Sequence, residues 1–121
     1  MISCGIDLIE IERLAQIVQR HGMRFLSRVY TDRELAEVGQ NMASLAARFA
    51  AKEAVSKALG TGIGRMSWQD VEVLRGPNGE PRLFLHGAAA SLAREKGLTD
   101  WSISLSHAQV VAAAMVVATG Q

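Results

Sequence analysis

Residues 49–62 read Phe-Ala-Ala-Lys-Glu-Ala-Val-Ser-Lys-Ala-Leu-Gly-Thr-Gly, a helix-forming run that ends in two glycines around a threonine. The run places the carboxylate of Glu53 and the ammonium of Lys57 four residues apart, on the same side of a helix. Carboxylates suit hard metal ions, ammonium groups suit phosphates, and glycines let a backbone approach a ligand closely. This stretch therefore offers three parts of a phosphate-handling site.

The same residues also fit a plainer interpretation. Glu53 and Lys57 stand in the favoured order for an ordinary surface ion pair, worth about 0.2–0.5 kcal/mol. Gly60 is equally suited to capping the C-terminus of a helix. Taken alone, the stretch favours this plainer interpretation, so the choice depends on the rest of the chain.

The helix predicted over residues 43–59 carries a seam of small side chains, which lets another element pack very close. At 100° per residue the seam spans about 100° of the helix surface. Glu53 and Lys57 lie at its edge, beside Phe49, and so not on the most exposed face. The seam consists of Ala47, Ala50, Ala51, Ala54 and Ala58.

Short helices and strands are predicted on both sides of this helix. Thr31 and Glu34 form a capping-box pattern at the start of one helix, and Pro77-Asn78-Gly79-Glu80 is a strong hairpin signal. The strands are few and partly apolar on both faces, so they need covering by the helices or by another subunit. We expect one α+β domain over residues 1–121. Helices are predicted over 9–20, 23–30, 31–38, 43–59 and 87–96, and strands over 1–8, 71–74, 83–85, 101–106 and 110–118.

Composition sets bounds on the kind of protein. The chain has 121 residues, a formal net charge of +1 and one cysteine, Cys4. One cysteine allows no internal disulfide and no cysteine metal site, and its apolar surroundings predict a buried thiol. The sequence shows no secretory leader and no apolar run long enough to span a bilayer, which predicts a cytoplasmic protein without membrane association.

Arginines recur at helical spacing near the N-terminus. Arg20, Arg24 and Arg28 follow at intervals of four, and Arg13 lies seven residues before Arg20. If the helical phase continues through Gly22, the four form one basic stripe. The default interpretation is a solvated face. Nucleic acid is a poor partner because the net charge is small and no aromatic residues interleave with the stripe; an acidic protein fits better.

Four motifs, in order, make the chain similar to a known family. They are Gly5-Ile6-Asp7-Leu8-Ile9-Glu10-Ile11, the run from Arg48 to Gly62, Asn78-Gly79-Glu80-Pro81 and Ser104-Leu105-Ser106-His107. Together they closely resemble the bacterial holo-acyl-carrier-protein synthases, the short, homotrimeric 4′-phosphopantetheinyl transferases. The resemblance runs from about residue 2 to residue 118. One departure is Val111, where the family often has a tyrosine in a mainly structural strand.

The resemblance implies a fold and a reaction. The fold is a small antiparallel sheet packed against a long central helix, assembled as a homotrimer with active sites at the subunit interfaces. A serine of apo-acyl carrier protein attacks the β-phosphorus of coenzyme A, the phosphopantetheine group moves to the serine, and adenosine 3′,5′-bisphosphate leaves. The reaction serves fatty-acid synthesis and depends on Mg²⁺, with Mn²⁺ as an alternative.

The resemblance also assigns residues. Asp7 and Glu53 would hold the metal and, with Lys57, carry catalysis, with Lys57 offsetting charge on the pyrophosphate. Arg13 stands where the family has an arginine that contacts the acidic carrier protein, and the basic spacing adds Arg20, Arg24 and Arg28 to that predicted surface. The identity of the general base stays open, Glu53 being one group suited to orient a water. The residues implied to contact coenzyme A are Arg48, Lys57, Gly60, Thr61, Gly62, Asn78, Gly79, Pro81, Ser106 and His107.

Several of these residues have a plainer alternative. Asp7 suits a helix N-cap or a strand end, and His107, which shares the parity of the apolar residues in its strand, suits a core histidine. Asn78 suits a simple turn, and Arg48 a solvated helix position. For the whole chain, the alternatives are a transferase for polyketide or peptide-synthetase carriers, and a non-catalytic binding module. Intact Asp7, Glu53 and Lys57 argue against the module.

Overall fold

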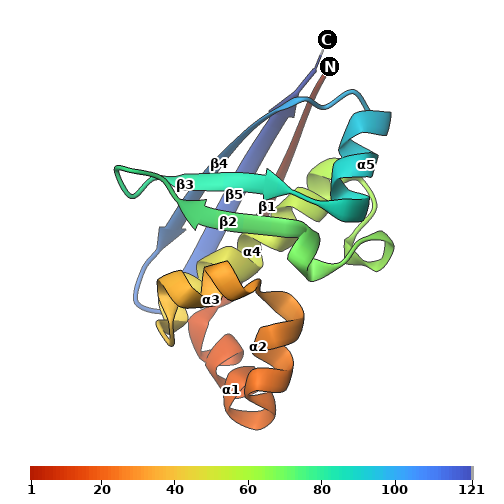
Figure 1. Ribbon diagram of the computed structural model, residues 1–121. Coiled ribbons are helices and arrows are strands. Elements are labelled where there is room, and N and C mark those ends of the chain that lie inside the picture. Colours follow the sequence, from red (N-terminus) through yellow and green to blue (C-terminus); the bar gives the residue numbers. More distant parts are fainter. Residues whose placement is uncertain (121) are drawn as a thin grey trace.

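The computed structural model describes residues 1–120 (Figure 1). No helix within these residues is both long and apolar enough to cross a membrane. In chain order the elements are β1 (Ile2–Glu10), α1 (Ile11–His21), α2 (Met23–Val29), α3 (Asp32–Val38), α4 (Met42–Leu59), two 3₁₀ turns (Ile63–Arg65 and Trp68–Asp70), β2 (Val71–Arg75), β3 (Pro81–Leu85), α5 (Gly87–Glu95), β4 (Asp100–His107) and β5 (Val111–Thr119).

Two antiparallel sheets share the long helix α4. Strands β1, β5 and β4 form a three-stranded sheet in that order, and β2 pairs with β3 in a separate hairpin. Helix α4 packs on β1 and β5, while α1, α2 and α3 gather at one end of the molecule (Figure 1). The α+β fold predicted from the sequence, a small antiparallel sheet against a long helix, is therefore confirmed.

The alanine seam of α4 is what brings the helix so close to the sheet. Ala50, Ala51 and Ala54 are fully buried, as the seam predicts. A Cβ atom placed on Gly5 of β1 would stand only 1.9 Å from the carbonyl oxygen of Ala54. The backbones of β1 and α4 are therefore in direct contact at Gly5. This contact fixes the position of Asp7, two residues further along β1, relative to the axis of α4.

We expect Gly5→Ala to destabilise the fold by about 3 kcal/mol or more, because the obstructing atom is helix backbone, which cannot rotate away. Urea unfolding followed by circular dichroism measures the change. Gly64→Ala is the matched control, since a Cβ atom there meets nothing within 4 Å. Equal stability of the two variants would show that the sheet and α4 are not in close contact at Gly5.

The first strand and first helix differ from their predicted bounds. Strand β1 continues to Glu10, because Ile9 pairs with Ala112 and Glu10 with Val111 on β5. The predicted break at Gly22 is confirmed: this glycine has φ +55° and ψ −136°, so α1 ends before it and α2 starts after it, and the condition for a single arginine stripe is not met. The capping box at Thr31 and Glu34 is confirmed.

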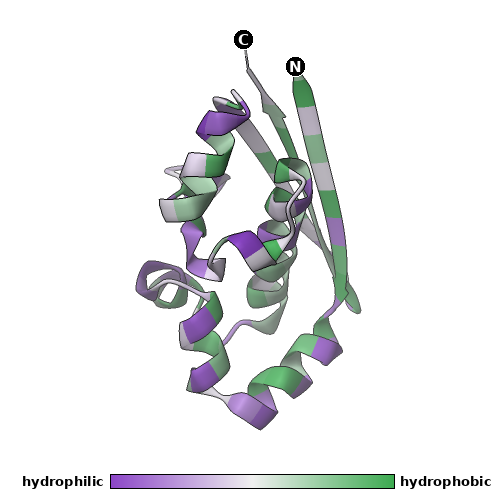
Figure 2. Ribbon diagram, turned by 90° about the vertical axis from the view of Figure 1, so that its right-hand side faces the viewer, coloured by the Kyte–Doolittle hydropathy of each residue, from purple (hydrophilic) through white to green (hydrophobic). Residues whose placement is uncertain are grey.

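One face of the three-stranded sheet lies open. Figure 2 shows the helices on one side of this sheet and none on the other. The side chains of Ile2, Ile6 and Leu8 on this face are 72%, 60% and 65% exposed. Cys4 points the same way and is exposed, so the predicted buried thiol is wrong in the single chain: β1 alternates, and Cys4 falls on the face away from α4.

A buried ion pair crosslinks the other side of α4. Lys52 Nζ lies 2.8 Å from Glu34 Oε1, and both side chains are fully buried. Lys52 also donates to the carbonyls of Trp68 and Val71, and Glu34 accepts from the amide of Val73. The pair thus joins α3, α4 and β2, and with every polar atom satisfied it sets the rotation of α4 about its axis.

Candidate active site

The predicted catalytic residues of β1 and α4 lie together in the structure. Lys57 Nζ donates to Asp7 Oδ1 at 3.0 Å and to the carbonyl oxygen of Ile6 at 2.9 Å. The ammonium of Lys57 therefore pairs with β1, and the ion pairs among residues 1–120 do not include one between Glu53 and Lys57. The plainer interpretation of these two residues, a simple helix ion pair, is wrong.

Glu53 completes a cluster of two carboxylates and one ammonium. Partial burial raises the pKa of Glu53, the negative charge of Asp7 raises it further, and Lys57 lowers it again. Two carboxylates that repel one another beside an exposed surface are poised to receive a divalent cation. The fold thus brings together Asp7 and Glu53, which are 46 positions apart in the sequence.

The glycine turn follows directly from α4. Gly60 has φ +76° and caps the helix, its amide donating to the carbonyl of Lys57 at 3.0 Å. The amides of Thr61 and Gly62 also donate back, to the carbonyl of Ser56 at 3.2 and 3.4 Å. The turn therefore exposes Thr61 and two glycines whose backbone has no side chain in front of it. Its backbone amides already donate hydrogen bonds to carbonyls of the last turn of α4.

A second group of predicted residues gathers at the other half of α4. A cavity of about 210 Å³ is lined by Arg48, Arg75 and His107, and by the hairpin residues Gly79 and Pro81. Two of its side chains are cationic, and His107 is exposed, so the core-histidine alternative is wrong. The cavity suits an anionic ligand with a flat or apolar part against Pro81.

Arg48 is not the solvated helix residue of the plainer interpretation. Its side chain is buried, with Nη2 3.0 Å from Glu37 Oε1 and Nε donating to the carbonyl of Val73 at 3.0 Å. Burial lowers its pKa, and Glu37 raises it again. Arg48 is therefore held rigidly at the edge of the cavity, with its guanidinium already oriented.

Ser106 and Asn78 lie outside this cavity. Ser106 is on the opposite face of β4 from His107 and lines a shallow hollow with Ile6 and Met115 on the open face of the sheet. Asn78 is in the hairpin, where its backbone N–H donates to Glu80 Oε1 at 2.9 Å. Within one chain the structure therefore does not bring Ser106 and His107 to one ligand.

The two groups of residues are well separated. Arg48 and Lys57 stand nine positions apart on the same helix, which corresponds to roughly 14 Å along its axis. The carboxylates and the glycine turn lie at the C-terminal end of α4, and the cationic cavity at its N-terminal half. Either one long ligand spans them, or the two groups serve different sites.

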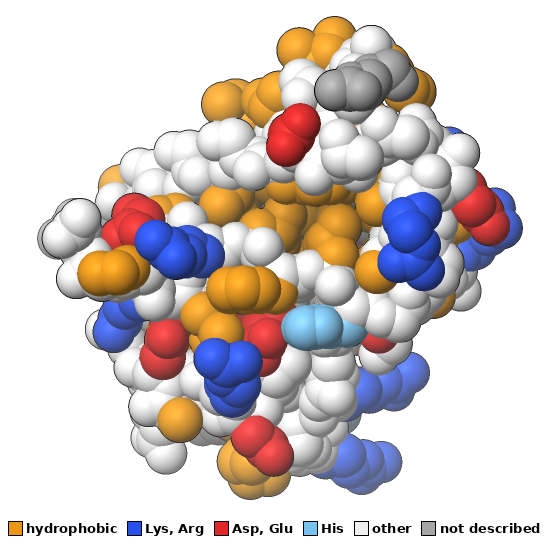
Figure 3. Space-filling view, turned by 45° about the horizontal axis from the view of Figure 1, so that its top comes forward, with side chains coloured by type: hydrophobic (Ala, Val, Ile, Leu, Met, Phe, Trp, Pro, Cys, Tyr) orange, Lys and Arg blue, Asp and Glu red, His pale blue; other side chains and the backbone are white. Residues whose placement is uncertain are grey.

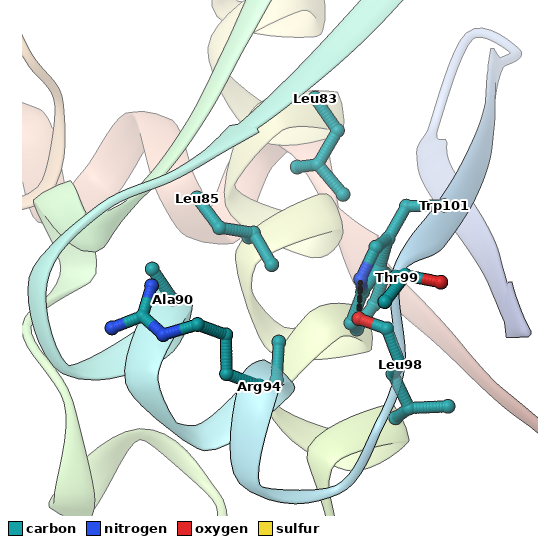
Figure 4. A pocket seen from close by; sticks show the side chains of 8 residues that line it. Leu83, Leu85, Ala90, Arg94, Leu98, Thr99 and Trp101 are labelled. Atoms are coloured by element: carbon teal, nitrogen blue, oxygen red, sulfur yellow. Dashed lines mark hydrogen bonds between the residues drawn. The ribbon is translucent and has the colours of Figure 1, made fainter. Parts of the chain in front are cut away.

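A larger cavity, of about 430 Å³, contains none of the predicted site residues. It lies between β3, α5 and the start of β4, where Figure 3 shows hydrophobic side chains gathered in a hollow. In Figure 4 Leu83 and Leu85 of β3 face Trp101 of β4, whose Nε1 donates to the carbonyl of Leu98 at 3.2 Å. Its lining carries no carboxylate, so this cavity offers no carboxylate ligand to a metal ion.

The predicted partner surface is only partly continuous. Arg13 and Arg20 flank a cavity of about 250 Å³ on α1, together with Gln16, Ile17 and His21. Arg24 and Arg28 are exposed on α2, beyond the break at Gly22. The single helical stripe is therefore replaced by two basic segments on adjoining helices.

Two residues near these sites were not singled out from the sequence. Arg75 joins the cationic cavity because β2 pairs it with Pro81. Lys96 follows α5 and places its ammonium over Gly60. The strand pairing gives a signal for Arg75, since it directly precedes the hairpin, but no sequence pattern links Lys96 to Gly60.

Comparison with known proteins identifies the family. The profile of the 4′-phosphopantetheinyl transferase superfamily matches residues 3–115. A holo-[acyl-carrier-protein] synthase of Moorella thermoacetica is 52% identical over 97% of this chain and 93% of its own length, and one of Carboxydothermus hydrogenoformans is 48% identical over 97% of each.

Solved structures agree with the sequence relatives. The Helicobacter pylori holo-[acyl-carrier-protein] synthase in complex with coenzyme A superposes with a TM-score of 0.88 at 33% identity, covering 96% of this chain and 99% of that one. The Neisseria meningitidis synthase superposes with a TM-score of 0.89 at 35% identity, covering 98% and 99%. The chain therefore belongs to the 4′-phosphopantetheinyl transferase superfamily, among its holo-acyl-carrier-protein synthases.

Proposed function

We propose that the family reaction takes place at Asp7, Glu53 and Lys57 of this chain. The reaction transfers 4′-phosphopantetheine from coenzyme A to a serine of apo-acyl carrier protein, releases adenosine 3′,5′-bisphosphate, and serves fatty-acid synthesis. The observation that carries the proposal is the pairing of Lys57 with Asp7 at 3.0 Å beside Glu53, whose pKa is raised. A non-catalytic binding module has no need for two carboxylates whose charges act on one another.

The carboxylate pair fits a magnesium ion. Asp7 and Glu53 are close enough for the charge of Asp7 to raise the pKa of Glu53, and a divalent cation relieves this repulsion. Two carboxylates suffice, because Mg²⁺ keeps several water ligands and is completed by substrate phosphates; among residues 1–120 no cluster of three acidic, histidine or cysteine ligands forms. When bound there, the ion would neutralise pyrophosphate charge.

Lys57 supplies a fixed positive charge at the same place. Its hydrogen bonds to Asp7 and to the carbonyl of Ile6 hold the ammonium, while about half of its side chain stays exposed. Phosphoryl transfer needs little covalent help from the protein, so catalysis depends on positioning and charge stabilisation. Lys57 would offset the charge that develops on the leaving bisphosphate.

The raised pKa of Glu53 leads to a prediction about pH. Protons and Mg²⁺ compete for the same carboxylate, so at limiting Mg²⁺ the rate should fall as the pH drops towards the raised pKa. More Mg²⁺ should move this acidic limb to lower pH. Initial rates across pH at two Mg²⁺ concentrations measure the shift. An acidic limb that stays in place at both concentrations would remove Glu53 as a metal ligand.

A homotrimer would explain the open sheet face and the divided site. Ile2, Ile6, Leu8 and Met115 expose a continuous apolar surface, which is unusual for a monomer. Subunit packing on this face would cover Cys4, bring Ser106 to an interface, and let the cationic cavity of one chain face the carboxylates of another. Sedimentation equilibrium tests this: three times the chain mass of 13.0 kDa supports it, and a monomer contradicts it.

The basic residues of α1 are proposed to bind the carrier. Arg13 and Arg20 are exposed around one hollow, and neither is in an ion pair among residues 1–120. We expect Arg13→Glu to raise the KM for acyl carrier protein about tenfold or more, because a repulsive charge replaces an attractive one, and to leave the KM for coenzyme A unchanged. Steady-state kinetics with each substrate varied in turn measures both values.

The outcome for carrier binding has a matched control. Arg65→Glu makes the same charge change at an exposed residue of the 3₁₀ turn Ile63–Arg65, far from α1 in the sequence. If Arg13→Glu and Arg65→Glu raise the carrier KM equally, overall charge explains the effect, and α1 is not the docking surface. A panel of fatty-acid, polyketide and peptide-synthetase carriers then tests which carrier class is preferred.

A further inference from the structure

The C-terminus of α5 is firmly anchored. The amide of Lys96 donates to the carbonyl of Leu92 at 3.1 Å, and the amide of Leu98 to that of Ala93 at 2.9 Å. Gly97 has φ +69°, which reverses the chain, and Leu98 is buried. These contacts fix the backbone of Lys96, so the direction in which its side chain leaves α5 is set by the fold.

The ammonium of Lys96 lies over the glycine turn that follows α4. A Cβ atom on Gly60 would stand 4.0 Å from Lys96 Nζ, which is its nearest neighbour there. Lys96 is exposed, and it takes part in none of the ion pairs found among residues 1–120. The charge is therefore available to a ligand on the turn, and the missing side chain of Gly60 leaves the space for one.

The turn by itself is a poor place for an anion. It follows the C-terminus of α4, where the helix dipole is negative and repels negative charge. The amides of Gly60, Thr61 and Gly62 already donate to helix carbonyls. Lys57, the nearest cation on α4, is partly neutralised by Asp7 at 3.0 Å. A phosphate bound beside the turn therefore needs a further positive charge.

We propose that Lys96 is this charge, a substrate-binding residue that contacts phosphate oxygens of coenzyme A at the Gly60–Gly62 turn. The inference rests on the proposed function, which puts the pyrophosphate beside Lys57 and this turn. Lys96 acts on binding more than on the chemical step, because its ammonium lies over Gly60 and takes no part in the pairing of Lys57 with Asp7. Its exposed, flexible ammonium holds the ligand and need not be aligned with the reacting atoms.

Steady-state kinetics on Lys96→Ala tests the proposal. We expect the KM for coenzyme A to rise about three- to tenfold, the effect of losing one exposed charge-assisted hydrogen bond, with kcat within about twofold. Lys96→Arg should restore most of the affinity for coenzyme A. The difference in coenzyme A KM between Lys96→Ala and the unchanged chain should shrink at high salt. Calorimetric titration with adenosine 3′,5′-bisphosphate reports the same loss without turnover.

Two further variants distinguish a failure of the Lys96 proposal from a failure of the proposed active site. Arg94→Ala removes a cation from the same helix on the side of the large cavity, and it should leave the coenzyme A KM unchanged. Lys57→Ala should lower kcat. If Lys57→Ala is impaired but Lys96→Ala binds coenzyme A normally, or changes only the carrier KM, the inference is overturned and the proposed site stands. If neither variant is impaired, the proposed site itself fails.

Discussion

Glu53→Gln is expected to lower the rate of phosphopantetheine transfer by about 10²–10³-fold, with coenzyme A still bound. Glutamine keeps the shape of the side chain but cannot carry the negative charge that we assign to metal binding. The loss of one group that stabilises transition-state charge typically has an effect of this size. Single-turnover rates at saturating coenzyme A and Mg²⁺ measure it directly.

The stability of the same variant separates catalysis from folding. The pKa of Glu53 is raised in the folded chain, so the carboxyl ionises more readily in the unfolded chain, and this lowers the folding stability as the pH rises above the usual glutamate range. Glutamine mimics the neutral form, so at neutral pH Glu53→Gln should unfold at the same temperature or higher. Glu95→Gln, an exposed residue of α5, is the matched control. A Glu53→Gln variant as active as this control would refute the assignment.

Lys52→Met is expected to destabilise the fold by about 3–5 kcal/mol, although Lys52 directly precedes Glu53 in the sequence. The substitution leaves Glu34 buried without its cation, and removing one partner of a buried ion pair is strongly unfavourable. Burial lowers the pKa of Lys52, but Glu34 at 2.8 Å raises it again. Guanidinium unfolding gives the free-energy difference.

A double variant identifies the cause of that loss. Adding Glu34→Gln to Lys52→Met removes the orphaned charge and should recover part of the stability, while Glu34→Gln alone leaves Lys52 unpaired and should be destabilising. If the two changes add without recovery, the loss comes from packing and not from the charge. If Lys52→Met unfolds like the unchanged chain, the pair does not hold α4 in place.

Local patterns predicted the elements well, because their signals depend on neighbouring residues. The alanine spacing gave α4 its buried seam, Thr31 and Glu34 gave the capping box, and the hairpin signal joined β2 to β3. The predicted end of the first strand was wrong because strand pairing determines it. Ile9 and Glu10 fit a helical pattern in the sequence, but in the structure they pair with β5. The exposure of Cys4 follows from which face of β1 meets α4, which the residues around it do not reveal.

The candidate site was harder to assemble from the sequence. The meeting of Asp7 with Lys57 came from family resemblance, since nothing local joins two residues 50 positions apart. The salt bridge between Glu34 and Lys52 was missed because Glu34 was already assigned to the capping box and Lys52 alone resembles a solvated charge. The opposite directions of Ser106 and His107 follow from strand alternation, but their motif suggested a pair. Lys96 reaches Gly60 only through the tertiary fold.

The most direct test of the central claim is intact-mass spectrometry of apo-acyl carrier protein incubated with this chain, coenzyme A and Mg²⁺, beside a control with EDTA. We predict that the carrier gains the mass of one phosphopantetheinyl group on its serine, in the presence of the metal and not in the EDTA control. No mass gain on fatty-acid, polyketide or peptide-synthetase carriers, from protein shown to be folded, would contradict the account.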